Sequence, residues 1–246
     1  MPLPPRRVLR QFKYAMYLDG VDDYIYAPQR GIQLNQFTFL MTAWSTGCGG
    51  AYPRFFSLGD GVSIPNHFAY QVDYTGMNYL RYIDVGGSVR DVYGLYPQSP
   101  RFTYNPTMWG LSWDGSLTLK SYVNGSLYVT RTLSYQPKPI YASFRAPAYH
   151  SLGMFIVHAM LYSRVLSDSE IQWNFRNPDN PVRDGLVLWL QAHPDYVKDI
   201  DGDGVLEWID LSGYGNHGKI YGAQLVQLIR APARVLASGK VLGSVR

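Results

Sequence analysis

Short runs of apolar and aromatic residues, separated by clusters of turn-forming residues, follow one another from about residue 15 to residue 162. This pattern is typical of short β-strands. The chain's 21 tyrosines, 10 phenylalanines and 6 tryptophans favour strands, and its 24 glycines and 16 prolines supply turns between them. Strands are predicted at residues 37–45, 54–58, 68–74, 79–83, 117–123, 126–132 and 154–162.

A two-residue turn is predicted at Asn124 and Gly125, between the runs at residues 119–123 and 126–129. Both turn residues tolerate positive φ angles, which a tight hairpin turn requires. The sequence therefore predicts an antiparallel hairpin at this point.

One stretch predicts a helix. Ser167 and Glu170 have the spacing of a capping box, and the dipeptide at residues 177–178, Asn-Pro, ends the segment, so the helix is predicted at residues 168–176. Many strands with one late helix are typical of an all-β sandwich in which the helix covers one end.

The length of 246 residues suits one such sandwich with attachments. Apolar residues make up 46% of the chain and charged residues 16%, which excludes a disordered chain. Beyond residue 181 a continuous apolar run at residues 186–190 predicts a strand buried on both sides, and residues 219–221 form a further short run between glycines.

Both ends of the chain are basic. The segments at residues 1–13 and 224–246 contain no acidic residue, and their basic residues are Arg6, Arg7, Arg10, Lys13, Arg230, Arg234, Lys240 and Arg246. Removing these eight from the chain's 22 basic residues leaves 14 against 18 acidic ones, so the body is mildly acidic. Basic, proline-containing arms favour tethering to another molecule, although solubilising termini have the same composition.

No run of about 18 apolar residues is present, so no membrane span is expected. The N-terminal sequence MPLPPRR lacks the apolar stretch of a secretory signal. A virion protein reaches its place without such a signal, and a virion or an extracellular surface is therefore the expected location. The single cysteine, Cys48, excludes a disulfide within the chain.

Three segments resemble the laminin-G-like, concanavalin-A-like jelly-roll family. Residues 15–25 (AMYLDGVDDYI) resemble its opening FDGxDDYV strand pair. Residues 108–115 (MWGLSWDG) with residues 122–125 (YVNG) resemble its central hairpin, and residues 160–171 (MLYSRVLSDSEI) resemble its closing strand and helix. The resemblance implies an antiparallel jelly-roll sandwich over residues 14–178 and makes carbohydrate recognition an expectation.

Residues 185–190 and 210–223 also resemble this family, but there such segments usually precede the FDGxDDYV strands. Residues 179–223 are therefore expected to contain sheet-completing strands and to be followed by the basic tail at residues 224–246. We favour completion of the chain's own sheets, because the termini of a sandwich tend to lie close together. Strand exchange with a neighbour, or a truncated second repeat, are the alternatives.

Residues 199–210 (DIDGDGVLEWID) have the spacing of an EF-hand-type calcium loop. Such a loop supplies oxygen ligands from alternate positions, and Gly204 permits its sharp turn. The predicted ligands of a structural Ca²⁺ ion are Asp199, Asp201, Asp203, the carbonyl of Val205, Glu207 through water, and Asp210. The alternative is a solvated turn rich in aspartate and glycine.

Catalysis is not expected. Glycosidases of this fold place two carboxylates across the scissile bond, whereas the only glutamates here are Glu170, in the helix cap, and Glu207, in the predicted metal loop. The histidines lack the spacing of a zinc site, and His158 in its apolar run is expected to be structural. The tyrosines considered for stacking on sugar rings are Tyr70, Tyr74, Tyr79, Tyr82, Tyr93 and Tyr96, about half of which strand alternation turns inward.

These observations lead to two hypotheses. The first is a non-enzymatic structural or attachment protein of a virion or surface assembly, in which the basic arms contact other subunits and the sandwich binds a host surface or glycan. The second is a carbohydrate-binding module of a secreted or cell-surface protein. Nucleic acid is the less favoured partner for the arms.

Overall fold

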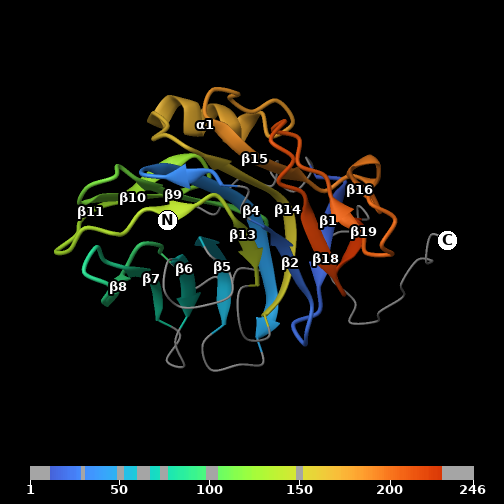
Figure 1. The fold of residues 1–246 in the computed structure, drawn as a ribbon, viewed down its shortest axis with the longest axis horizontal. Helices are drawn as coiled ribbons and strands as arrows, with labels where there is room; N and C mark the ends of the chain where they lie inside the picture. The colour runs from blue at the N-terminus through green and yellow to red at the C-terminus, as the bar shows by residue number, and fades with distance from the viewer. Residues whose placement is uncertain are drawn as a thin grey trace.

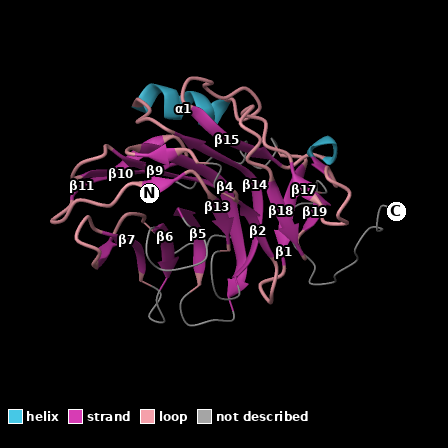
Figure 2. Cartoon of the chain, viewed as in Figure 1, coloured by secondary structure: helices cyan, strands magenta, loops and turns pink. Residues whose placement is uncertain are grey.

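The computed structural model describes residues 12–28, 31–48, 53–59, 67–72, 77–97, 105–147 and 152–228. These residues form an all-β, antiparallel jelly-roll sandwich with one short α-helix (Figure 1). Strands account for nearly all of the regular structure (Figure 2). The predicted fold class is confirmed.

The first layer, sheet A, contains eight antiparallel strands. In spatial order they are β11 (Ser126–Thr132), β10 (Thr118–Val123), β9 (Thr107–Trp113), β4 (Phe37–Cys48), β14 (Leu152–Tyr162), β1 (Tyr14–Leu18) and β19 (Gln224–Gln227), and β15 (Leu186–Gln191) also pairs with β14. The turn between β10 and β11 has positive φ at Asn124, 50°, and at Gly125, 79°, so the predicted hairpin is confirmed.

The second layer, sheet B, contains nine antiparallel strands. In spatial order they are β16 (Val197–Lys198), β17 (Glu207–Trp208), β18 (Gly218–Tyr221), β2 (Tyr24–Ala27), β13 (Phe144–Ala146), β5 (Arg54–Gly59), β6 (His67–Val72), β7 (Asn78–Ile83) and β8 (Val89–Tyr93). A separate pair is formed by β3 (Gln33–Leu34) and β12 (Ile140–Tyr141). The seven strands predicted up to residue 162 are all present, and where the structure describes their ends these lie within three residues of the predicted ones.

The main core lies between the two sheets and is rich in aromatic side chains. Alternate residues of each strand point into it, as the two-residue period of a strand requires. Phe39 of β4, for example, contacts Phe56 of β5 and Phe144 of β13 across the layers, at ring distances of 4.6 and 5.6 Å. Burying each side chain of this size stabilises the fold by about 1.5–3 kcal/mol.

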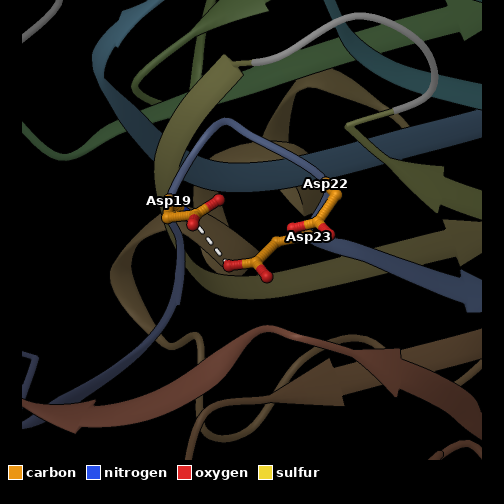
Figure 3. Close-up of side chains that lie close together, drawn as sticks. All are labelled: Asp19, Asp22 and Asp23. Atoms are coloured by element: carbon orange, nitrogen blue, oxygen red, sulfur yellow. Dashed lines mark hydrogen bonds between the residues drawn. The ribbon is translucent and has the colours of Figure 1, made fainter.

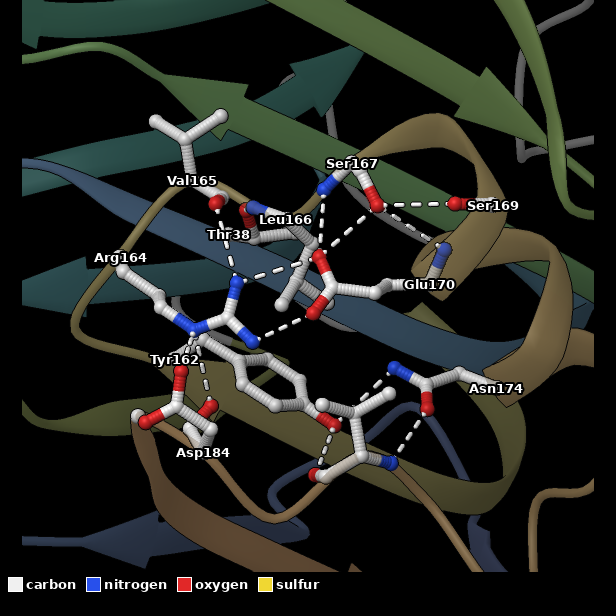
Figure 4. Close-up of polar contacts among 12 residues, drawn as sticks. Thr38, Tyr162, Arg164, Val165, Leu166, Ser167, Ser169, Glu170, Asn174 and Asp184 are labelled. Atoms are coloured by element: carbon white, nitrogen blue, oxygen red, sulfur yellow. Dashed lines mark hydrogen bonds and ion pairs between the residues drawn. The ribbon is translucent and has the colours of Figure 1, made fainter.

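A second apolar cluster lies on the outer side of sheet A, beneath the helix α1 (Asp168–Arg176). Ser167 and Glu170 form the predicted capping box, so the helix and its cap are confirmed (Figure 4). Asn174, buried on the inner side of the helix, donates a hydrogen bond to the Tyr162 hydroxyl of β14. No helix among the described residues is long and apolar enough to cross a membrane.

The C-terminal segment enters the chain's own sheets, the first of the three arrangements predicted. β15 pairs with β14, and its burial on both faces confirms the strand predicted at residues 186–190. β18 pairs with β2, and β19 pairs with β1. The basic tail predicted at residues 224–246 thus begins inside a strand; residues 1–11 and 229–246 of the two arms lie outside the described residues.

Candidate functional site

Strands β13, β2 and β18 lie side by side in sheet B (Figure 1). Their outer face presents polar and aromatic side chains. The register places Arg145, Tyr26 and Lys219 in one row and Tyr24 with Tyr221 in the next. Their neighbours along each strand point into the core, so these five side chains share the outward face. They are called the tyrosine–arginine face below.

Three of these side chains form a layered stack. The rings of Tyr24 and Tyr221 lie 4.4 Å apart with an interplanar angle of 19°. The guanidinium carbon of Arg145 lies 4.3 Å from the centroid of the Tyr24 ring. The Tyr24 ring thus touches both neighbours, while Tyr221 is 36% exposed. We call this group of Arg145, Tyr24 and Tyr221 the open stack.

The guanidinium of Arg145 has donors without acceptors. No oxygen of the described residues accepts a hydrogen bond from it, and its Nε atom is buried without a partner. Contact with an aromatic ring is electrostatic and satisfies none of the five N–H groups. The open stack therefore holds a cation in a fixed position with its hydrogen-bonding capacity unused.

A second group on the outer face of sheet B also contains two stacked tyrosines and an arginine, and it includes an aspartate as well. The rings of Tyr79 on β7 and Tyr93 on β8 are stacked with centroids 5.2 Å apart, and Arg81 lies over the Tyr79 ring. Asp91 accepts two hydrogen bonds from Arg81, at 2.8 and 2.9 Å. This group of Arg81, Tyr79, Tyr93 and Asp91 is called the closed stack.

The tyrosines singled out in the sequence divide between core and surface. Tyr70, Tyr82 and Tyr96 are buried in the core, so these three of the six candidates point inward and do not stack on a ligand. Tyr79 and Tyr93 belong to the closed stack, and Tyr74 lies outside the described residues. The stacked pair of Tyr24 and Tyr221 was not singled out, because its two strands come from opposite ends of the chain.

The aspartate-rich loop adjoins one end of the tyrosine–arginine face. Asp199, Asp201 and Asp203 each offer a carboxylate oxygen within 4.8 Å of the others. Nζ of Lys219 lies 2.7 Å from Asp203 and 3.5 Å from Asp201. This ammonium group is the main cause of a lowered pKa of the Asp203 carboxyl. The structure thus brings together three of the predicted calcium ligands beside an outward-facing cation.

The other predicted ligands make different contacts. The amide of Val205 donates to Asp203, and the carboxylate of Glu207 accepts the amide of Ile200. Asp210 is buried and its carboxylate accepts four hydrogen bonds, whose donors are the amides of Trp189, Ser212 and Asn216 and the hydroxyl of Ser212. Asp210 therefore ties the turn that follows it to β15, and the calcium ion stays a prediction.

A second group of carboxylates lies at the opposite end of the face, in the turn between β1 and β2 (Figure 3). It consists of Asp19, Asp22 and Asp23, which the sequence presented only as part of a family motif. The amide of Asp19 donates to the carboxylate of Asp23. Burial is the main cause of a raised pKa of the Asp23 carboxyl. Asp23 directly precedes Tyr24, so negative charge borders the open stack on this side.

Both glutamates of the chain make structural contacts. Glu170 pairs with Arg164 at 2.6 Å, and this hydrogen-bonded arginine is the main cause of a pKa lowered to about 2 (Figure 4). A general acid requires the opposite shift. Glu207 is 7% exposed and binds a backbone amide. His158 contacts the hydroxyl of Thr42 at 2.9 Å, and burial lowers its pKa to about 3.

Solved structures with similar folds include a candidate carbohydrate-binding protein from Bacteroides ovatus, with a TM-score of 0.63 and 14% identity over 92% of this chain and 62% of its own. The SAP-like pentraxin of Limulus polyphemus matches with a TM-score of 0.48 and 11% identity over 66% and 82% of the two chains. The CBM40 domain of the Ruminococcus gnavus IT-sialidase, bound to α2,3-sialyllactose, matches with a TM-score of 0.42 and 18% identity. The match covers 57% of this chain and 82% of that domain's chain.

At 14% identity the likeness to the B. ovatus structure shows a shared jelly-roll, lectin-like fold, and this chain spans only 62% of the length of that structure. No protein-family model and no curated protein matches the chain.

Proposed function

We propose that this chain is a non-enzymatic carbohydrate-binding domain whose ligand lies on the tyrosine–arginine face. The open stack carries the proposal, because it holds a partly exposed tyrosine ring beside a cation with unused donors. The laminin-G-like motifs of the sequence and the likeness in fold to the candidate carbohydrate-binding protein from B. ovatus support it.

The chemistry of the face suits a sugar. A pyranose has an apolar C–H face, which stacks on an aromatic ring, and hydroxyl groups, which need donors and acceptors. Tyr221 offers the ring, the phenol groups of Tyr24 and Tyr221 offer both donor and acceptor, and Lys219 offers a further donor. Strand pairing fixes all of these groups, so little ordering is required on binding.

Screening on a glycan array, followed by calorimetry with the best glycan, tests the proposal. We expect Tyr221→Ala to reduce affinity at least tenfold, since a buried aromatic contact is worth about 1–3 kcal/mol. Tyr93→Ala is the matched control, because Tyr93 is an exposed tyrosine of the closed stack on the same face. Equal losses in the two variants, or no glycan bound, would contradict the proposal.

A second candidate function is attachment within a virion or surface assembly, displayed outside the cell. Strands β1 and β19 pair in antiparallel register, and the amide of Leu228 donates to the carbonyl of Lys13 at 2.8 Å. The two basic arms therefore adjoin the same point of sheet A, where their positive charges act together on an acidic surface of a neighbouring subunit.

The mass in solution of the full chain and of a chain lacking residues 1–11 and 229–246 tests this second function. The shortened chain retains every described strand. We expect the full chain alone to assemble, and the assembly to weaken as salt rises, since screening reduces charge attraction. Identical masses for the two chains at low salt would exclude assembly through the arms.

A further inference from the structure

The open stack also specifies the class of glycan. We infer that the ligand is an acidic glycan whose sugar carboxylate binds the guanidinium of Arg145; this inference rests on the proposed function. The geometry on which it stands is the guanidinium of Arg145, which has no acceptor among the described residues and lies against Tyr24, beside the exposed ring of Tyr221.

A guanidinium presents its N–H donors as a planar fork that matches the two oxygens of a carboxylate. The contact of Arg145 with Tyr24 fixes the side chain while leaving that fork unused. The Nε atom is buried, so the donors open to a ligand are those of the two terminal nitrogens, which can form parallel hydrogen bonds to one carboxylate. A sugar hydroxyl accepts a single weaker bond, whereas a carboxylate satisfies two donors at once.

The positions of the other charges support the same class. Lys219 lies in the same row as Arg145, separated from it by Tyr26, so two cations lie on the same side of the stacked Tyr24 and Tyr221 rings. The carboxylates of Asp201 and Asp203 are engaged by Lys219, and Asp23 lies beyond Tyr24. An acidic sugar is therefore oriented with its carboxylate toward Arg145 and its ring toward Tyr221.

The closed stack shows that the open donors are particular to Arg145. Arg81 also lies over one ring of a stacked tyrosine pair on the outer face of sheet B, but its guanidinium already donates two hydrogen bonds to Asp91. The carboxylate of Asp91 occupies, within the chain, the place that we assign to the ligand's carboxylate at Arg145.

The test uses three acidic polymers, polygalacturonate, hyaluronan and polysialic acid, each beside the same polymer with its carboxylates methyl-esterified. Calorimetry with the full chain is expected to show at least one acid bound tenfold or more tightly than its ester. Arg145→Gln is expected to remove that preference, and Arg145→Lys to restore part of it as a point charge. Arg81→Gln is the matched control and is expected to bind as the unaltered chain does.

The outcomes separate the inference from the function. If the esters bind as tightly as the acids, the ligand is not an acidic glycan, although glycan binding still stands. The same holds if Arg145→Gln melts like the unaltered chain and leaves the preference for the acids unchanged. Binding to no glycan on the array would overturn both. Arg145-dependent binding to a single-stranded oligonucleotide, with no polymer bound, would identify a nucleic-acid phosphate as the anion and overturn the inference.

Discussion

The two tyrosine–arginine stacks on the outer face of sheet B have the same parts and different hydrogen bonding. In each, two tyrosines from neighbouring strands stack, at 4.4 Å in the open stack and 5.2 Å in the closed one, and an arginine lies over one ring. In the closed stack Asp91 accepts two hydrogen bonds from the arginine. In the open stack the guanidinium has no acceptor among the described residues.

This difference separates a structural contact from a recognition surface. A satisfied ion pair on paired strands contributes modestly to stability and has nothing left for a ligand. A fixed guanidinium without an acceptor contributes less to the fold and binds an oxyanion without first breaking an internal bond. Variants that close the open stack or weaken the closed one test this distinction directly.

The largest effect is expected on closing the open stack with Ser57→Asp. Ser57 on β5 is the cross-strand partner of Arg145, as Asp91 is of Arg81. The new carboxylate would engage the guanidinium and reduce affinity for an acidic glycan tenfold to a hundredfold, corresponding to about 1.5–3 kcal/mol. Calorimetry measures the loss, with Ser57→Asn as the uncharged control of equal size. Full affinity in Ser57→Asp would show that Arg145 does not hold the anion.

The next effect concerns the predicted calcium ion, whose candidate carboxylates lie beside only one of the two stacks. Asp201 and Asp203 contact Lys219 of the tyrosine–arginine face, and no carboxylate cluster borders the closed stack within the described ranges. For a dissociation constant of about 1 mM, 10 mM Ca²⁺ would stabilise the fold by about 1.4 kcal/mol. The melting temperature should rise accordingly.

Two variants decide whether the three aspartates of the loop hold the ion. Asp199→Asn should abolish the calcium-dependent rise in melting temperature, and Lys219→Gln should enlarge it, because the ammonium competes with the cation for Asp203. An unchanged melting temperature in 10 mM Ca²⁺ for both the unaltered chain and Lys219→Gln would exclude the predicted site.

A smaller effect is expected on weakening the closed stack. Asp91→Asn removes the charge from a paired carboxylate that is a quarter exposed, so the fold should lose about 0.5–1 kcal/mol. Arg145→Gln removes a cation that has no ion pair with any described residue, so it should lower stability less. Thermal denaturation of the two variants compares them. A larger loss in Arg145→Gln than in Asp91→Asn would reverse the roles assigned to the two stacks.

Local signals in the sequence predicted the elements of the fold. The turn at Asn124 and Gly125 and the cap formed by Ser167 and Glu170 depend on residues only a few positions apart, so they could be recognised without knowing the sheet order. The run at residues 186–190 is apolar on both sides, and the structure buries it beneath the second apolar cluster and against the core.

The binding face could not be predicted in the same way, because it depends on pairing between distant strands. Which tyrosines point outward follows from register, and the bulge within β5 and the crossing from β2 to β18 are not visible in the sequence. Alternation alone left Tyr70 and Tyr93 equivalent, although one is buried and the other 48% exposed. Asp210 matched the spacing of a calcium ligand, but its position beside β15 directs its carboxylate to backbone amides.

The smallest effect is expected on replacing Asp23, beside the open stack. The change in stability should have the opposite sign to that of Asp91→Asn in the closed stack. Burial raises the pKa of Asp23, next to the open stack, so its ionised form is less stable in the folded chain than in the unfolded one. The contribution of Asp23 to stability should therefore rise as pH falls from neutral through the raised pKa toward the ordinary value of 3.8. Asp23→Asn should therefore raise stability at pH 7, where the carboxylate is ionised, and leave it unchanged near pH 3.

Chemical denaturation at pH 7 and pH 3 measures this change, with Asp91→Asn as the comparison. The amide oxygen of an asparagine at position 23 can still accept the hydrogen bond from the Asp19 amide, so the variant removes charge and keeps the turn. The two variants should shift stability in opposite directions at pH 7, since Asp91 has a cationic partner and Asp23 lies beside two further aspartates. A loss in Asp23→Asn equal to that in Asp91→Asn would show that Asp23 has a cationic partner of its own, and the open stack would then have to be treated as a second structural ion-pair site.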